Sequence, residues 1–269
     1  MIDYHMHGDF CGHARGELEE YVASALEKGF REIGFSAHLP KVIDPDPYHA
    51  MLEEDLPRYV DLVNDLQERY RSDIVIRLGI EADYFEGHEE KTERLLDAHP
   101  FDYVLGSVHF LDDWHFTSRA GLPRYERENP SSVFPRYYDL LGRMIDTGLF
   151  DIVAHADAIT REDFRPVAPL DRLYRDIARR LKAKGMALEV STVGLRRGAG
   201  SIYPNEEFLG ICIGAGVPLT LGSDAHAPED VGRDYDKAFE ILQKLGAREI
   251  ATYEARRMRL RPLADFNVA

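Results

Sequence analysis

Short apolar segments alternate with longer amphipathic segments along most of the chain, and this alternation is the feature that most restricts the fold. Most of the apolar segments are rich in Val, Ile, Leu or Phe, which is typical of strands that are covered on both faces. Glycine follows several of the amphipathic segments, where it relieves the left-handed backbone that ends a helix. The predicted strands are residues 2–7, 32–37, 74–81, 101–109, 150–155, 186–191 and 217–222.

The amphipathic segments have the spacing of helices. In residues 170–184, Leu173, Ile177 and Leu181 recur at steps of four residues, which places them on one helical stripe. About seven strand–helix units in succession predict a parallel α/β fold. An open doubly wound sheet and a closed barrel both fit this order, but no glycine fingerprint for a dinucleotide follows the first segment. No repeat or linker divides the chain, so a single domain over residues 1–269 is expected.

Side chains that bind metals gather where the predicted strands end. His5 and His7 are two residues apart, so a strand points both rings to the same side, and such a pair suits one divalent metal. The carboxyl ends of parallel strands form the edge where such folds build active sites, and this placement favours the barrel. Nine residues share it, including seven of the eleven histidines: His5, His7, His13, His38, Glu81, His109, His155, Asp224 and His226.

Each of these residues also has an ordinary explanation. A single histidine after a strand is commonly a hydrogen-bonded loop residue, Glu81 alone fits a helix start, and Asp224 alone fits an N-cap. One shared site is more economical than nine separate explanations. Because one catalytic zinc takes about three protein ligands, we expect two or three adjacent metals bridged by Glu81. No cysteine cluster is present, which favours Zn, Mn or Fe over a thiolate site.

The same positions resemble the polymerase-and-histidinol-phosphatase (PHP) superfamily, from residue 2 to about residue 232. Within it the chain is most similar to the histidinol-phosphatases of histidine biosynthesis, in residues 3–7, 34–40, 106–110 and 222–226. The resemblance implies a distorted (β/α)7 barrel with three divalent metal ions. It also implies the ligands of each ion, which are His5, His7, Glu81 and Asp224 for the first, Glu81, His109 and His155 for the second, and His13, His38 and His226 for the third.

This resemblance implies a phosphomonoesterase that acts on L-histidinol phosphate, a small-molecule substrate. A metal lowers the pKa of water from about 15.7 towards about 7, so we expect a hydroxide between the metals that Glu81 links to attack phosphorus, with no covalent phospho-enzyme. The expected catalytic residues are Glu81, Asp224 and His226, and Asp224, or a water that it orients, handles the proton for the leaving alkoxide. Arginine suits phosphate, and the expected substrate-binding residues are Arg161, Arg196 and Arg197.

Composition narrows the partners. The formal net charge of −15, from 33 basic and 48 acidic residues, argues against a protein that coats nucleic acid. No apolar segment reaches the roughly 20 residues that cross a membrane. Cys11 and Cys212 cannot form a disulfide framework and the first residues lack a secretion signal, so a cytoplasmic protein is expected. The sequence does not decide whether the protein forms a homo-oligomer. Three histidines away from the strand ends are expected at the solvent: His49, His88 and His99.

Two alternatives stay open at this point. The first changes only the substrate, to a PHP phosphoesterase for a nucleotide or phosphotyrosine. The second is a metal-binding module without turnover, against which the full set of nine ligands and the nearby arginines argue.

Overall fold

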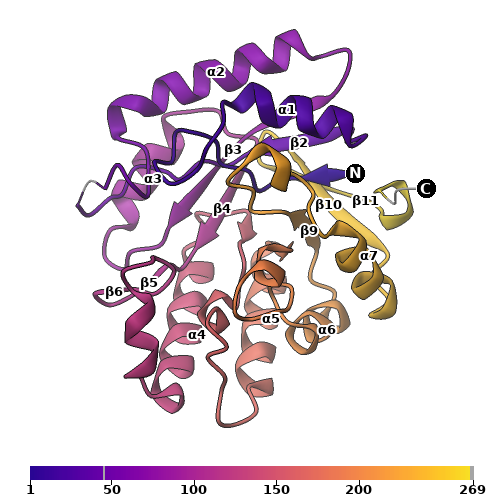
Figure 1. Ribbon diagram of the computed structural model, residues 1–269. Coiled ribbons are helices and arrows are strands. Elements are labelled where there is room, and N and C mark those ends of the chain that lie inside the picture. Colours follow the sequence, from indigo (N-terminus) through magenta and orange to yellow (C-terminus); the bar gives the residue numbers. More distant parts are fainter. Residues whose placement is uncertain (45, 267–269) are drawn as a thin grey trace.

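The computed structural model describes residues 1–44 and 46–266, and a parallel sheet organises them (Figure 1). The sheet has seven strands in the order β1-β2-β3-β4-β7-β8-β9, and all its neighbouring strands are parallel. Each predicted segment therefore overlaps one strand of this sheet, and only β3 extends beyond its segment, by two residues. The strands are β1 (Ile2–Asp3), β2 (Glu32–Phe35), β3 (Val75–Asp83), β4 (Tyr103–Ser107), β7 (Ile152–Val153), β8 (Ala187–Ser191) and β9 (Leu219–Gly222).

Hydrogen bonds from the segment just after β1 to β9 and the segment after it close the sheet into a barrel. β1 and β9 are the ends of the strand order, yet the Tyr4 amide donates to the Leu221 carbonyl at 3.0 Å. Beyond the strands, the His7 amide donates to the Ala225 carbonyl and the Ala225 amide donates to the His5 carbonyl, each at 3.0 Å. The chain thus adopts the barrel rather than the open sheet. Closure brings the first and the last members of the predicted ligand series together.

Helices connect the strands and cover the outside of the barrel (Figure 1). In α5 (Asp171–Lys184), Ile177 and Leu181 of the predicted apolar stripe are buried, Leu173 is half-buried, and Tyr174, outside the predicted stripe, is buried beside them. The described part of the chain has no helix with the length and apolar character needed to cross a bilayer. The other helices are α1 (Leu18–Glu27), α2 (Leu56–Arg69), α3 (Glu89–Asp97), α4 (Pro130–Thr147), α6 (Glu206–Ala215) and α7 (Tyr235–Lys244).

Two antiparallel hairpins lie at opposite ends of the barrel. β5 (Phe110–Leu111) and β6 (Trp114–His115) directly follow β4, so they lie at the carboxyl end of the strands. β10 (Glu249–Glu254) and β11 (Arg257–Pro262) form the second hairpin. The residue after β10, Ala255, donates its amide to the Asp102 carboxylate just before β4, at 2.9 Å. The second hairpin therefore covers the amino end and leaves the carboxyl end free for a site.

A buried tyrosine packs across the strands on one side of the barrel. Tyr103 on β4 is fully buried, and its hydroxyl donates to the Tyr4 carbonyl, just after β1, at 2.7 Å. The Tyr103 side chain lies across β3 and β2, which separate β4 from β1 in the sheet. A Cβ on Gly79 of β3 or on Gly34 of β2 would lie 2.2 Å from this side chain. The two glycines leave the space that the tyrosine fills.

We expect Gly79→Ala to lower the free energy of unfolding by about 1–3 kcal/mol, the usual cost of overpacking a filled core. The added methyl group overlaps the Tyr103 ring, and urea unfolding followed by circular dichroism measures the loss. Gly214→Ala is the control, because a Cβ at this exposed position of α6 meets no atom within 4 Å. Alanine there is expected to stabilise the helix by up to about 1 kcal/mol. Equal stabilities for the two variants would contradict this account of the packing.

Candidate metal centre

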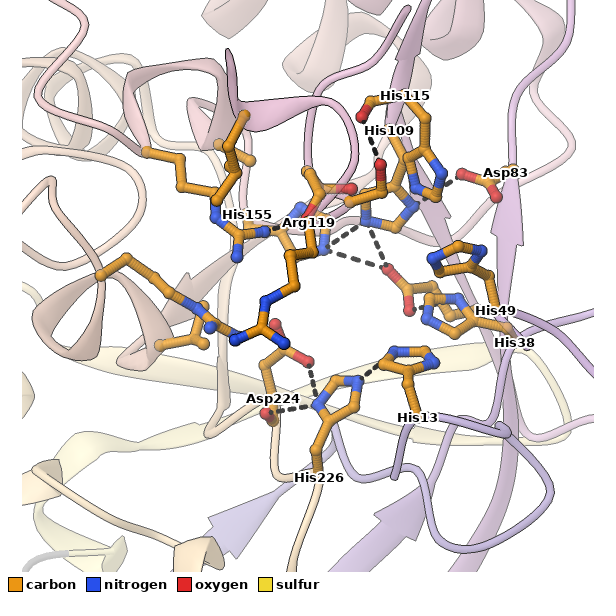
Figure 2. A pocket seen from close by; sticks show the side chains of 18 of the residues that line it. His13, His38, His49, Asp83, His109, His115, Arg119, His155, Asp224 and His226 are labelled. Carbon is orange, nitrogen blue, oxygen red and sulfur yellow. Dashed lines mark hydrogen bonds and ion pairs between the residues drawn. The ribbon is translucent and has the colours of Figure 1, made fainter. Parts of the chain in front are cut away.

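The nine predicted ligands meet at the carboxyl end of the barrel, and Figure 2 labels six of them: His13, His38, His109, His155, Asp224 and His226. His5 and His7 are fully buried beneath the others, and each lies close to the carboxylates of Glu81 and Asp224. The remaining seven line a cavity of about 390 Å³: His13, His38, Glu81, His109, His155, Asp224 and His226.

The carboxylate of Glu81 lies at the centre of this group and is 1% exposed. Its Oε2 atom lies 3.2 Å from His5 Nε2 and 3.0 Å from His38 Nδ1. Its Oε1 atom lies 3.0 Å from His155 Nε2 and 3.6 Å from His109 Nε2. The predicted convergence of these side chains is therefore confirmed. A carboxylate with imidazoles facing both oxygens has the arrangement of a ligand shared between two cations.

Asp224 faces the same group from the segment after β9. Its Oδ1 atom lies 3.1 Å from His7 Nε2, 3.6 Å from His5 Nε2 and 3.3 Å from His226 Nδ1. The other nitrogen of His226, Nε2, lies 2.9 Å from His13 Nε2 at the mouth of the cavity. The predicted ligands therefore form one continuous set of contacts, from His5 and His7 in the interior to His13 at the partly exposed mouth of the cavity.

Several of these atoms lack the partners that a purely hydrogen-bonded cluster would need. Within the described residues, His5 Nε2 and Glu81 Oε2 are buried and lie 3.2 Å apart, yet neither forms a hydrogen bond of suitable geometry, although buried polar atoms are rarely left unpaired. The facing Nε2 atoms of His13 and His226 can share at most one proton, whereas a cation accepts lone pairs from both. Several groups of three ligand atoms lie within 4.8 Å of one another. This donor set fits divalent metal ions.

The centre also carries buried negative charge. Glu81, Asp224 and Glu189 surround His5, and among the described residues no Lys or Arg forms an ion pair with these three carboxylates. Burial by itself lowers the pKa of His5, but Glu189, Glu81 and Asp224 together raise it well above its ordinary value. The surroundings of His5 therefore favour a positive charge at this position, which a bound cation supplies as well as a proton does.

His7, His13, Glu81 and Asp224 have the charge states that metal binding requires. Burial, together with the neighbouring His226, lowers the pKa of His7 to about 3 and that of His13 to about 4. Burial alone raises the pKa of the Glu81 and Asp224 carboxyls, but the facing imidazoles bring both well below their ordinary values. Neutral imidazoles and ionised carboxylates are the forms that bind metals.

Two acidic residues behind the ligands were not singled out from the sequence. Asp83 Oδ1 lies 2.7 Å from His109 Nδ1, and Glu189 Oε1 lies 2.7 Å from His5 Nδ1. A carboxylate on the far ring nitrogen keeps the proton there and leaves the other lone pair for a metal. The alternation along β3 gives a signal for Asp83, which is two residues after Glu81 and shares its side of the strand. The signal for Glu189 is only that it is an acid within an apolar segment.

Cys11 contacts two of the predicted ligands, His38 and His7. Its buried Sγ atom accepts a hydrogen bond from the His38 amide at 3.2 Å and lies 3.5 Å from His7 Nδ1. The thiol is not among the cavity-lining residues, so it acts behind the imidazoles.

Three arginines line the cavity, and they are not the three predicted ones. Arg161 and Arg197 lie in it as expected, and Arg119, which was not predicted, extends into it (Figure 2). Burial and the neighbouring Arg197 lower the pKa of Arg161, so two cations face each other where an anion would stabilise both. Arg196 is not among the lining residues. It donates to the Ser223 carbonyl at 2.6 Å, because its loop turns the guanidinium towards the backbone next to Asp224.

Aromatic side chains form another part of the cavity wall. His49, expected at the solvent, lines the cavity instead. Its Nδ1 atom lies 2.7 Å from Asp46 Oδ2, which Lys41 also contacts at 2.7 Å. The ring centre of His115 on β6 lies 4.5 Å from that of His49, and His115 stacks on Phe110 at 4.1 Å. The cavity therefore combines metal-ligating side chains, arginines and flat rings.

Comparison with known proteins identifies the family of this chain. The family model of the PHP domain matches residues 3–193, and the chain belongs to this family. It is 32% identical to the probable histidinol-phosphatase of Deinococcus radiodurans, over 96% of this chain and 98% of that protein. It is 30% identical to the histidinol-phosphatase of Bacillus subtilis, over 88% of this chain and 98% of that protein.

A solved structure supports the fold. The histidinol phosphate phosphatase of Lactococcus lactis, determined in complex with zinc, L-histidinol and phosphate, superimposes with a TM-score of 0.81 at 23% identity. The match covers 96% of this chain and 98% of that one. The distorted barrel expected from the family resemblance is therefore confirmed.

We expect metal ions to stabilise the folded chain, because they bind the native state alone. Zinc or manganese at about 100 times its dissociation constant adds about 2.7 kcal/mol, or about 5–10 °C in the melting temperature of a domain of this size. Calorimetry before and after chelation measures the difference. Glu81→Gln is expected to remove most of it, whereas Glu240→Gln on the exposed side of α7 should keep it. A melting temperature that does not respond to metal in the parent would contradict the site.

Proposed function

We propose that this chain is a metal-dependent phosphomonoesterase that hydrolyses L-histidinol phosphate to L-histidinol and phosphate, a step of histidine biosynthesis. The observation that carries the proposal is that the metal-binding group shares one cavity with Arg119, Arg161 and Arg197. A phosphate monoester is a small dianion that needs cationic contacts on several of its oxygens. The relatives named histidinol-phosphatase, which align over nearly their whole length, support this choice among monoesters.

Three divalent ions, zinc, manganese or iron, fit the donor set. When bound, they supply a nucleophile by lowering the pKa of water, and charge that neutralises the phosphoryl oxygens. The proposed ligands are His5, His7, Glu81 and Asp224 for the first ion, Glu81, His109 and His155 for the second, and His13, His38 and His226 for the third.

The arginines bind and orient the phosphoryl group. Arg161 and Arg197 line the cavity, and their mutual repulsion is relieved when a dianion lies between them. A planar guanidinium offers two parallel donors to two phosphoryl oxygens, which fixes the direction of the ester bond. The wall lined by His49 and His115 is then the surface left for the histidinol part of the substrate.

Asp224 is the residue placed to move a proton. Its side chain is 12% exposed and lines the cavity, and its carboxyl is ionised because the facing imidazoles lower its pKa. We assign to its carboxylate the proton of the attacking water, which it returns to the leaving alkoxide as the ester P–O bond breaks. Glu81 and His226 hold the ligand group in place during this exchange. The balance is one water and one phosphate ester consumed, and one phosphate and one L-histidinol released, without a covalent phospho-enzyme.

The direct test is phosphate release from L-histidinol phosphate, with elemental analysis of the same preparation before and after chelation. We expect turnover by the metal-loaded protein, loss on chelation and recovery with zinc or manganese. Nucleoside monophosphates and phosphotyrosine belong in the same panel. A higher kcat/KM for either of them would replace the substrate but keep the class of enzyme. A metal-replete protein that hydrolyses no monoester would support the metal-binding module instead.

We expect Arg161→Ala and Arg197→Ala to lower kcat/KM by about ten- to hundredfold, since a hydrogen bond to a charged group contributes about 1.5–3 kcal/mol. Most of the change should be in KM, with the metal content unchanged. Arg196→Ala is the matched comparison, because this guanidinium contacts the Ser223 carbonyl rather than the cavity. It should lower kcat through the neighbouring Asp224 and change KM less. A rise in KM for Arg196→Ala as large as that for Arg161→Ala would show that Arg196 binds substrate.

A further inference from the structure

We propose that Glu189 is a positioning residue of the metal centre. Its two carboxylate oxygens each accept one hydrogen bond, and together these bonds hold His5 and His155 with their Nε2 atoms directed at Glu81. This inference rests on the proposed metal-dependent function and adds to it a residue outside the set of ligands.

The position of Glu189 needs an explanation, because an ionised carboxylate inside a barrel is costly unless it is paired. Glu189 lies in the middle of β8 and is 1% exposed. Among the described residues His5 is its one ion-pair partner, and no Lys or Arg contacts it. Its charge is therefore balanced only through the metal-binding group that it supports.

The first oxygen determines which nitrogen of His5 carries the proton. Oε1 lies 2.7 Å from His5 Nδ1, so the proton stays on Nδ1. In the neutral, metal-binding form of the ring the lone pair is then on Nε2, which lies 3.2 Å from Glu81 Oε2 and 3.6 Å from Asp224 Oδ1. With the proton on Nε2 instead, the ring could not bind a cation at this place.

The second oxygen holds the backbone of His155. Oε2 accepts a hydrogen bond from the His155 amide at 2.7 Å. The φ of His155 is +24°, a conformation that residues with a side chain rarely adopt, and such strain persists only where neighbouring contacts impose it. In this conformation His155 Nε2 lies 3.0 Å from Glu81 Oε1. The Glu189 carboxylate thus contacts both His5, which faces Glu81 Oε2, and His155, which faces Glu81 Oε1.

The neighbouring strand leaves room for this carboxylate. A Cβ at Gly222 on β9 would lie 1.9 Å from Glu189 Oε1 and 2.6 Å from the Cβ of His5. Any side chain at this position would displace the acid and the imidazole together. The packing of β9 is therefore matched to the contact between Glu189 and His5.

An amide of the same shape cannot replace the carboxylate. Both partners of Glu189 are donors, because a backbone amide always donates and a His5 ring that binds through Nε2 donates through Nδ1. A glutamine offers one accepting oxygen and one NH2 group. Whichever way it turns, one donor faces another donor, so either the His5 tautomer or the His155 backbone loses its support.

The test is metal binding by Glu189→Gln, measured by competition with a chelator and by elemental analysis after dialysis. We expect an affinity for zinc or manganese that is about 10–100-fold weaker than that of the parent, with fewer ions retained per chain. Glu32→Gln is the matched control, since Glu32 is also buried but contacts Tyr4 and Arg77 where β2 begins. The control is expected to lose stability and to keep its metal affinity.

A folded Glu189→Gln protein with the affinity and metal content of the parent would overturn the proposal, and so would an equal loss in Glu32→Gln. If Glu189→Gln does not fold, nitrogen-15 NMR of the assigned histidines in the zinc-loaded parent protein tests the proposal instead, by showing whether His5 Nδ1 is protonated. A proton on His5 Nδ1 is expected, and an unprotonated Nδ1 would refute the assignment. Neither measurement uses substrate, so failure to hydrolyse histidinol phosphate would end the proposed function and leave this inference standing.

Discussion

One buried charge organises the molecule. The carboxylate of Glu81, 1% exposed, has imidazole nitrogens within 3.0–3.6 Å that come from the ends of other strands. A charge in such a place costs several kcal/mol unless it is compensated, and the compensation comes from groups far apart in the sequence. Only a closed barrel brings them together, so the hydrogen bonds that join β1 to β9 are a condition for the site. The fold and the metal centre are therefore coupled, because each lowers the cost of the other.

Much of this arrangement could be predicted from the sequence, because the strands are short apolar segments and the ligands stand at their ends. All seven strands and the convergence on Glu81 follow from that placement. Glu189 could not be found in this way. It lies within a strand, and the face that an inner residue presents depends on register and barrel closure, which a pattern of apolar residues does not encode. Its role depends on a contact with His5, which is 184 positions away.

Three loop side chains, Arg119, His49 and Arg196, were placed wrongly or missed for a different reason. Arg196 and Arg197 are adjacent in the sequence, and composition cannot tell which one faces the cavity. The short helical turn Val193–Arg196 decides it, by directing Arg196 to the Ser223 carbonyl and leaving Arg197 at the cavity. Arg119 and His49 come from long connections whose path depends on tertiary contacts. A sequence pattern therefore predicts functional residues at strand ends more reliably than functional residues whose side chains enter the cavity from a loop.

The charges also imply an order of assembly for the proposed function. Without cations, Glu81, Asp224 and Glu189 place negative charge beneath the cavity, and the chain as a whole carries a net charge of −15. A phosphate dianion approaching this surface is attracted by the arginines but repelled by the buried acids. Bound metal ions change the charge at the buried end of the cavity from negative to positive and leave the charge of the arginines unchanged. The buried acids therefore affect substrate binding through the metals that they retain. A substitution that displaces a metal ligand is expected to weaken metal binding and substrate binding together.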